Sequence, residues 1–269
     1  MTCPVWWERR PACLSSSSPS RSVRYPEHAM QLFRTDLGVS VRLPTGAELP
    51  LRHFIGVGRN YVEHAREQGA AVPERPMIFT KNPAAACLDG DDIVIPRVCQ
   101  DREQVDYEGE LAVVIGARAR DVSERDAADP SSGIVLGYCI ANDVSARWWQ
   151  KEGSGGQFCR GKSFDSFCPL GPVVTPARQV RDPQSLALTT RLNGEVVQSA
   201  STGQMQFSCA YLVSELSRGT TLLPGTVILT GTPSGVGMAR NPPRYLRAGD
   251  AVSIEIEGLG ALTNRVRAE

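Results

Sequence analysis

Short apolar runs separated by turn-forming residues make up most of the chain after Gln31. Runs of about four to eight residues that are rich in valine and isoleucine are typical of buried strands. The runs with this pattern are HFIGVG, MIFTK, DIVIP, ELAVVIG, IVLGYCIAND, LGPVVTP, TVILTG and DAVSIEIEGLGALTNRV. Two hairpins are also expected, one around Pro44-Thr45-Gly46 and one at Asn193-Gly194, because these residues favour tight turns.

Few segments have the periodicity of a helix. NYVEHAREQG and FSCAYLVSELSRG are predicted helices, and Gly69 and Gly219 follow them as stop signals. SARWWQKEG predicts a third, shorter helix. Many short strands with few helices predict a β-dominated α+β fold in a single domain and argue against a doubly wound sheet.

The first part of the chain has a different composition. Residues 1–29 contain the stretch CLSSSSPSRSVR, which is rich in serine and arginine, lacks periodicity and predicts a disordered extension. A transit peptide is one alternative, although acids and prolines interrupt any amphipathic helix there. A start at Met30, which would make the extension non-native, is the other. We therefore expect an extension over 1–29, a β-hairpin segment over 30–53 and the main domain over 54–269.

Charge and cysteine usage exclude several classes of protein. Lys and Arg number 29, as do Asp and Glu, so the formal net charge is zero. Such a balance argues against a nucleic-acid or membrane-surface partner, and no apolar run is long enough to cross a bilayer. The eight cysteines form no CxxC pair and there are only three histidines. We expect reduced, buried thiols in a cytoplasmic protein without a zinc site.

Three carboxylates alternate in the stretch VDYEGELAVVIG. Asp106, Glu108 and Glu110 would share one face of a strand that otherwise looks like core. Buried like charges need compensation, and a divalent cation bound by oxygen ligands would supply it. Asp143, at the end of the apolar run CIAND, offers a further ligand. The alternative is an exposed strand edge with Asp143 as a helix cap.

Three other segments carry candidate chemistry. His64 and Glu67 are spaced i, i+3 on one predicted helix, as a carboxylate-oriented general base requires, although a solvated surface pair has the same spacing. Lys162 lies among apolar residues in CRGKSFDSFCPLG and either has an anionic partner or extends to water. The loop TGTPSGVG brings backbone N–H groups close to a ligand or is simply a tight turn.

Taken in order, six motifs resemble the fumarylacetoacetate hydrolase family. They are GVGRNYVEHARE, DYEGELAVVIG, NDVSAR, GKSFDSFCPLGP, LNGEVVQ and LTGTPSGVG, and the resemblance extends from about Phe54 to Val266. The run WWQKEGSGGQFCRGKSFDSFCPLGP and the ending RNPPRYLRAGDAVSIEIEGLGALTNRV are most similar to the branch of short proteins with acylpyruvate hydrolases and oxaloacetate tautomerases or decarboxylases.

The resemblance implies a mixed β-sheet roll, a homodimer and a particular set of site residues. It implies that Mg²⁺ or Mn²⁺ is bound by Glu108, Glu110 and Asp143. It implies a catalytic group of His64, Glu67 and Lys162, with the His–Glu pair on a segment that closes over the site. It also implies substrate contacts from Arg59, Gln150 and Thr232. It gives Asp106 no ligand role, so we expect this residue at the entry to the strand, nearer solvent.

The same resemblance implies a metal-dependent enzyme that acts on small 2-oxo or β-dicarbonyl acids through a metal-bound enolate. C–C bond hydrolysis of an acylpyruvate-type substrate is the first expectation. Keto–enol tautomerisation or decarboxylation of oxaloacetate is the close alternative, and a ureidoglycolate lyase is a weaker one. A relative that binds a metabolite without catalysis is the alternative from a different class of protein, although the His64, Glu67 and Lys162 set is more than binding alone requires.

Overall fold

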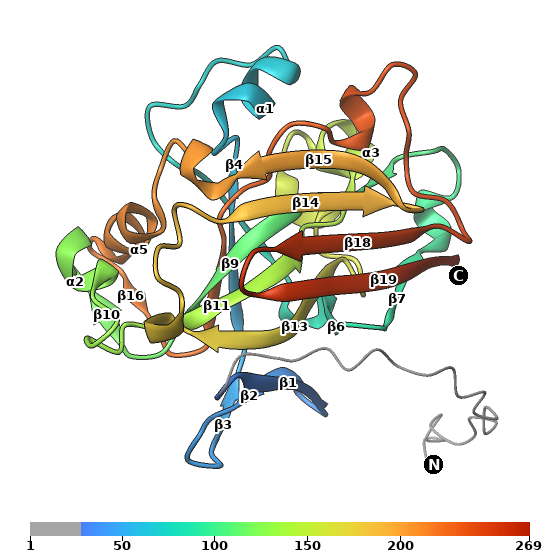
Figure 1. Ribbon diagram of the computed structural model, residues 1–269. Coiled ribbons are helices and arrows are strands. Elements are labelled where there is room, and N and C mark those ends of the chain that lie inside the picture. The colour runs from blue at the N-terminus through green and yellow to red at the C-terminus, as the bar shows by residue number, and fades with distance from the viewer. Residues whose placement is uncertain (1–27) are drawn as a thin grey trace, which may run out of the picture.

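The computed structural model describes residues 28–269 and contains two β-sheets packed against each other (Figure 1). The large sheet contains β1 (Met30–Thr35), β2 (Gly38–Arg42), β3 (Glu48–Pro50), β4 (His53–Gly58), β5 (Met77–Lys81), β6 (Ala86–Leu88), β9 (Gly109–Ile115), β11 (Val135–Asn142), β13 (Cys168–Pro176) and β17 (Thr226–Leu229). Its strand order is β3-β2-β1-β13-β11-β9-β17-β4-β5, and β6 pairs with β13.

The small sheet has five strands and lies in front of the large one in Figure 1. Its strands are β7 (Asp92–Ile95), β14 (Ala187–Leu192), β15 (Glu195–Ser201), β18 (Ala251–Ile256) and β19 (Gly260–Ala268). They are ordered β15-β14-β18-β19-β7. Two further pairs join β8 (Val105–Asp106) to β12 (Ser145–Ala146) and β10 (Ala119–Arg120) to β16 (Thr221–Leu222). Parallel and antiparallel pairs occur in both main sheets, so both are mixed.

The helices are few and short. The α-helices are α1 (Val62–Glu67), α2 (Glu124–Ala128), α3 (Arg147–Gln150), α4 (Phe158–Gly161) and α5 (Cys209–Ser217). The 3₁₀ turns are η1 (Pro83–Ala85), η2 (Arg97–Cys99), η3 (Glu152–Ser154), η4 (Ala177–Gln179), η5 (Thr202–Gln204) and η6 (Gly237–Ala239). The predicted β-dominated α+β fold is confirmed. The three predicted helices correspond to α1, α3 and α5, whereas α2 and α4 were not predicted.

Both faces of β9 are covered, and this explains its uninterrupted apolar run. Leu111, Val113 and Ile115 belong to the core between the two sheets. Ala112 and Val114 point the other way, into a second core. Alternate side chains of a strand point to opposite faces, so a strand covered on both sides has no polar position in its middle. The carboxylates at its start lie just outside this apolar stretch.

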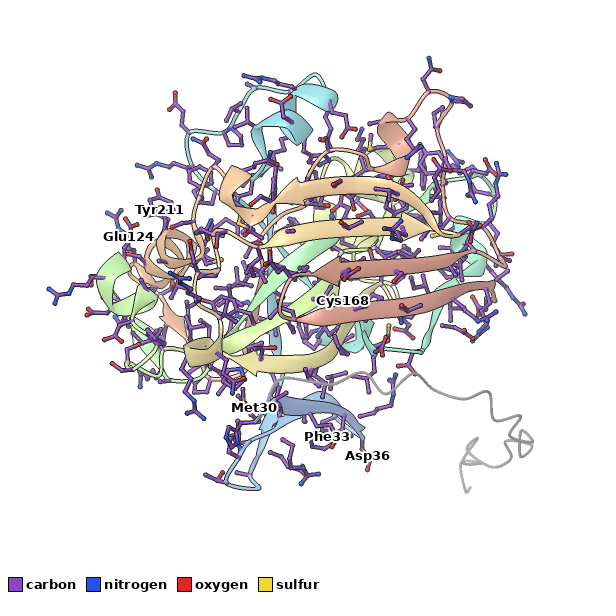
Figure 2. The ribbon with its side chains drawn as sticks, in the orientation of Figure 1. Met30, Phe33, Asp36, Glu124, Cys168 and Tyr211 are labelled. Carbon is purple, nitrogen blue, oxygen red and sulfur yellow. The ribbon has the colours of Figure 1, made fainter. Side chains whose placement is uncertain are left out.

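The second core is built largely by the N-terminal hairpin of β1, β2 and β3. Met30 and Val41 are buried against Leu170 and Val174 of β13. β1 also pairs antiparallel with β13, so residues 30–53 continue the large sheet. Figure 2 shows Met30 at the sheet end of this hairpin and Asp36 at its turn. The division of the chain at residue 54 stays a prediction, and residues 1–27 of the predicted extension lie outside the described residues.

Most of the described cysteines are free and buried, as the absence of CxxC pairs predicts. Cys87, Cys99, Cys139, Cys168 and Cys209 are buried, and Cys159 is exposed. Burial raises the pKa of Cys139 and Cys168 to about 12, so these thiols stay protonated at neutral pH. Within residues 28–269, none of the helices has the length and apolar character needed to span a bilayer.

Shortening Leu111 tests the importance of the core between the sheets. Leu111 is 0% exposed, so Leu111→Ala is expected to lower the free energy of unfolding by about 2–5 kcal/mol through lost burial and a residual cavity. The measurement is urea unfolding followed by circular dichroism. Leu37→Ala is the matched control, because Leu37 is 74% exposed and its loss is expected to change stability by no more than about 0.5 kcal/mol. Equal effects of the two changes would contradict the described packing.

Candidate active site

Three carboxylates from two neighbouring strands converge at one end of the large sheet. Glu108 precedes β9, Glu110 lies on it, and Asp143 directly follows β11. The pairing of β9 with β11 places Ala141 opposite Glu110, and the Asp143 N–H donates to the Glu108 carbonyl at 2.9 Å. One oxygen from each of the three carboxylates lies within 4.8 Å of the others, and all three residues are buried. The sequence prediction that these acids come together is therefore matched by their geometry.

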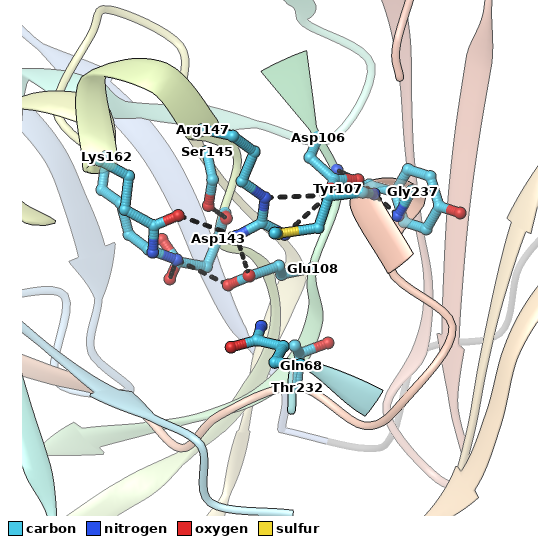
Figure 3. A network of polar contacts seen from close by, with 12 residues as sticks. Gln68, Asp106, Tyr107, Glu108, Asp143, Ser145, Arg147, Lys162, Thr232 and Gly237 are labelled. Carbon is cyan, nitrogen blue, oxygen red and sulfur yellow. Dashed lines mark hydrogen bonds and ion pairs between the residues drawn. The ribbon is translucent and has the colours of Figure 1, made fainter. Parts of the chain in front are cut away.

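Basic side chains compensate most of this charge (Figure 3). Lys162 Nζ donates to Glu108 Oε2 at 2.6 Å and also to Asp143 Oδ2. Lys81 Nζ donates to the other oxygen of Asp143 and, at 2.8 Å, to the Phe167 carbonyl. Arg147 Nη1 donates to Glu108 Oε1 at 2.7 Å. Within residues 28–269, Glu110 alone among these acids has no lysine or arginine as an ion-pair partner.

The pKa directions follow from this uneven compensation. Burial alone would raise the pKa of Glu108, but the charges of Lys162 and Arg147 outweigh it and hold that pKa well below its usual range. For Glu110, burial and then the neighbouring Asp143 and Glu108 all raise the pKa. Its Oε2 accepts the Gly231 N–H at 2.7 Å. The surroundings therefore disfavour a negative charge on Glu110. The three carboxylates offer oxygen ligands that fit a divalent hard cation, and a bound cation would lower the pKa of Glu110 again.

The prediction that Asp106 lies near solvent is wrong. Asp106 is 0% exposed. Its Oδ2 accepts from Arg147 Nε at 2.9 Å and Nη2 at 2.7 Å, and its Oδ1 accepts from the Gly237 N–H at 2.7 Å. A carboxylate that is fully paired with a guanidinium and backbone N–H groups can be buried without a metal. Asp106 thus ties the loop around Gly237 to the arginine that also holds Glu108.

The His–Glu pair lies on α1 and faces the carboxylates. His64 is buried, and its Nδ1 lies 3.1 Å from Glu67 Oε2. Glu67 Oε1 accepts the Gly235 N–H at 2.8 Å, which joins α1 to the loop after β17. Gln68 Nε2 lies 2.9 Å from His64 Nε2. The helix is a short segment of six residues, Val62–Glu67, and of these contacts the Glu67–Gly235 hydrogen bond is the one that ties it to the body.

Asn60 fixes the start of the α1 segment. Its side-chain amide donates to the Thr230 carbonyl at 2.7 Å and to the Phe207 carbonyl at 3.0 Å, and its Oδ1 accepts the Phe207 N–H at 2.8 Å. All three bonds are buried. The beginning of the segment is therefore clamped to the body independently of its far end.

Lys162 is placed by the tight packing of α4 on α3. A Cβ on Gly161 would lie 2.4 Å from the Gln150 backbone nitrogen and 2.7 Å from the Ala146 carbonyl oxygen. Only glycine allows this approach, and Lys162 follows directly at the end of α4. Its Nζ also lies 4.8 Å from the centre of the Phe79 ring. Burial alone would lower the pKa of Lys162, but Asp143 and Glu108 outweigh it and raise that pKa, so the ammonium stays charged.

The three predicted substrate contacts lie at the same pocket but differ in what they can offer. Arg59 Nε is buried and has no hydrogen-bond partner, so it is a free donor. Gln150 Oε1 accepts from Arg147 Nη1 at 3.0 Å, which leaves its amide NH₂ group. The Thr232 hydroxyl donates to the Gly109 carbonyl at 2.9 Å and accepts from Gln198 Nε2 at 2.7 Å. The hydroxyl of Thr232 therefore already uses its hydrogen in a bond within the protein.

One pocket gathers most of these residues. Seven of the nine predicted site residues line it: Arg59, His64, Glu108, Glu110, Gln150, Lys162 and Thr232. Glu67 and Asp143 lie behind this lining, where Glu67 contacts His64 and Asp143 accepts from Lys162. The space open to water is about 20 Å³, and one buried water needs about 10–15 Å³. With α1 in this position, the pocket therefore has room for about one water.

Sequence reasoning missed three residues at this site, namely Lys81, Arg147 and Gln68. Alternation along β5 places Lys81 on the same buried face as Phe79, and this signal was available in MIFTK. Arg147 follows the NDVSA stretch, and the need to compensate three acids could have pointed to it. Gln68 follows the predicted His–Glu pair directly, but a glutamine at the end of a helix has no distinctive pattern.

A mixed β-sheet roll with a buried carboxylate triad is an arrangement that suits an enzyme with a divalent cation. Comparison with known families agrees: residues 53–267 match the family described as Fumarylacetoacetate (FAA) hydrolase C-terminal. The chain belongs to this family. The family resemblance inferred from the motifs is confirmed, as is the expectation of an enzyme.

Two relatives are named for one reaction, the tautomerisation of oxaloacetate. The chain is 45% identical over 213 residues to oxaloacetate tautomerase fahd2, mitochondrial, of Xenopus laevis. The matched region covers 79% of this chain and 65% of the relative. The chain therefore spans less than two thirds of that relative. It is 43% identical to oxaloacetate tautomerase YisK of Bacillus subtilis, over 84% of this chain and 73% of the relative.

A solved structure supplies a ligand-bound comparison. Fumarylpyruvate hydrolase from Pseudomonas aeruginosa, in complex with Mn²⁺ and pyruvate, superposes with a TM-score of 0.73 at 31% identity. The match covers 93% of this chain and 100% of that one. Relatives of this fold thus include both tautomerases and a hydrolase.

Replacing Asp106 tests its structural role. Asp106→Asn keeps the shape but removes the charge that pairs with buried Arg147, so we expect the free energy of unfolding to fall by about 3–5 kcal/mol. Urea unfolding measures this change. Asp101→Asn is the control, because Asp101 pairs with Arg102 on the surface and its loss is expected to leave the unfolding midpoint unchanged. An unchanged midpoint for Asp106→Asn would contradict the buried pair.

Proposed function

We propose that this protein catalyses the keto–enol tautomerisation of oxaloacetate with Mg²⁺ or Mn²⁺ bound by Glu108, Glu110 and Asp143. The observation that carries the proposal is the His64–Glu67 pair above a buried carboxylate–lysine centre, in a chain 43% identical to a protein named oxaloacetate tautomerase. The first expectation from the sequence was acylpyruvate hydrolysis, and the relatives favour the tautomerase alternative.

Each proposed role follows from a side chain and its partners. Arg59 has a free buried Nε donor that suits a carboxylate of the substrate. Lys162 keeps its charge against Glu108 and Asp143 and supplies positive potential where negative charge develops in an enol or enolate. His64, with Nδ1 held by Glu67, would use Nε2 to take a proton from the substrate carbon and return it to oxygen.

The cation would polarise the 2-oxo group as a Lewis acid. Its ligands are fixed before it binds, because Lys81 and Lys162 hold Asp143 from both sides and Arg147 holds Glu108. The protein's own contribution is therefore to hold the carboxylates in place, to orient His64, and to limit the water around it.

Hydrolysis of an acylpyruvate is the second candidate. It is favoured by the likeness to the Pseudomonas hydrolase, whose structure holds Mn²⁺ and pyruvate. The same residues would act, but His64 would activate water for attack on the distal carbonyl. Decarboxylation of oxaloacetate and a ureidoglycolate lyase reaction are weaker candidates and belong in the same substrate panel.

An assay of purified protein with Mg²⁺ separates these reactions. We expect enol-oxaloacetate to be converted faster than acetylpyruvate is hydrolysed or ureidoglycolate is cleaved. His64→Gln is expected to lower tautomerisation by at least about 100-fold, the scale of a lost general base, and to leave Mn²⁺ affinity unchanged. Arg66→Met, at an exposed position of the same helix, is the control. Faster turnover of acetylpyruvate than of oxaloacetate would favour the second candidate.

Replacing Glu110 tests the metal site. Glu110→Gln is expected to weaken Mn²⁺ binding by at least about tenfold and to lower activity in parallel, as measured by titration calorimetry and by the assay. Chelator treatment of the unaltered protein is expected to abolish activity, and added Mg²⁺ or Mn²⁺ to restore it. Glu103→Gln, at an exposed position paired with Arg247, serves as control. Full activity and Mn²⁺ affinity in Glu110→Gln would exclude the assigned ligands.

The homodimer and the cytoplasmic location also stay predictions. Sedimentation of the purified chain gives the mass of the assembly and tests the first. The relatives include a vertebrate protein named as mitochondrial and a protein of Bacillus subtilis. Fractionation of the source cells tests the cytoplasmic location.

A further inference from the structure

The amide of Gln68 contacts the one nitrogen of His64 that Glu67 leaves free. Glu67 lies 3.1 Å from His64 Nδ1, on one side of the ring. Gln68 Nε2 lies 2.9 Å from His64 Nε2, on the other. Both His64 and Gln68 line the candidate pocket, and Figure 3 draws Gln68 beside Thr232 there. The base therefore has a protein partner at the position where it must meet substrate or water.

Glu67 determines which atoms donate and which accept in the hydrogen bonds that link Glu67, His64 and Gln68. Its Oε1 accepts the Gly235 N–H at 2.8 Å, and its Oε2 faces Nδ1. A carboxylate accepts hydrogen bonds, so Nδ1 carries the hydrogen and the lone pair of neutral His64 is on Nε2. The NH₂ group of Gln68 then donates to this lone pair.

Gln68 moves with the base that it contacts. The two residues are four positions apart at the end of α1, and the Gln68 N–H donates to the His64 carbonyl at 3.2 Å. Closing or opening of the α1 segment therefore leaves the amide next to His64. Only rotation of the Gln68 side chain uncovers Nε2, and the terminal torsion of a glutamine is soft.

We propose that Gln68 is a positioning residue that keeps water away from His64 Nε2 and so directs the site to proton transfer within the substrate instead of hydrolysis. Hydrolysis needs a water held on Nε2, and the pocket has room for about one water, for which the Gln68 amide competes. Tautomerisation needs no water. The inference rests on the proposed function, because it names what selects that reaction over its hydrolytic alternative.

The amide suits both protonation states of His64. The proton leaves the substrate carbon for Nε2, and the electron pair of the C–H bond remains on the substrate as an enolate. The same proton then passes from Nε2 to the enolate oxygen, so no water is consumed. Between these steps Nε2–H needs an acceptor, and rotation of the Gln68 amide offers its oxygen. Neither a lysine nor an aliphatic side chain could serve both states.

Gln68→Met and Gln68→Ala test this inference in the metal-loaded full chain. Methionine keeps the length of the side chain without its hydrogen bonds, and alanine also opens space for water. We expect the ratio of acetylpyruvate hydrolysis to oxaloacetate tautomerisation to rise about tenfold, the size expected for loss of one hydrogen bond. Arg66→Met is the control on the same helix. Thermal unfolding of each variant shows whether it is folded.

Nitrogen NMR of histidine-labelled protein gives a readout that does not depend on turnover. The chain has three histidines, and His64→Gln assigns the signals of His64. We expect the Nε2 resonance of His64 to shift in both Gln68 variants and to stay in place in Arg66→Met. A wild type without tautomerase activity would overturn the proposed function alone. An unchanged Nε2 signal, or rates that fall in parallel at a constant ratio, would overturn the role of Gln68.

Discussion

Lys162 donates to Glu108 and Asp143 at once, from a position with almost no contact with water. Buried carboxylates are costly unless they are paired, and the rest of the site can be understood as the extension of this pairing. Arg147 compensates Asp106 and the second oxygen of Glu108, and Lys81 compensates the second oxygen of Asp143. The exception is Glu110, whose pKa is raised by burial and by its acidic neighbours. Among the acids of this cluster in residues 28–269, Glu110 is thus the one without a basic ion-pair partner, and this suits the proposed cation.

The small sheet and the N-terminal hairpin serve this arrangement by covering opposite faces of β9. Leu111 and Val113 face the small sheet, whereas Ala112 and Val114 face the core that the N-terminal hairpin completes. A strand fixed from both sides cannot slip by a residue without exposing core positions. The carboxylates at its start are therefore held by packing that lies away from the candidate site.

Sequence patterns predicted the residue pairs whose relative position depends only on their spacing along one strand or helix. Glu108 and Glu110 alternate on a strand, and His64 and Glu67 share a helical face, so each pair could be read from the chain before the pairs were brought together. The missing parts are contacts across long separations, as between Arg147 and Asp106 or Lys81 and Asp143. Asp106 was misplaced because the family resemblance gave it no ligand role and because its neighbours in sequence did not reveal an arginine 41 positions away. The third acid, Asp143, was placed by the family resemblance together with its position after an apolar run.

The clamp at Asn60 divides the α1 segment into a fixed beginning and a far end with a lighter attachment. Three buried hydrogen bonds hold Asn60, whereas the Glu67–Gly235 contact, which is partly exposed, ties the helix to the opposite loop. A segment held in this way would move as a swing about its fixed beginning. Opening about this beginning would break the Glu67–Gly235 hydrogen bond, whereas the three hydrogen bonds of Asn60 would be kept. Such a pivot would return His64 to the same place beside Glu108 and Glu110 each time the segment closed.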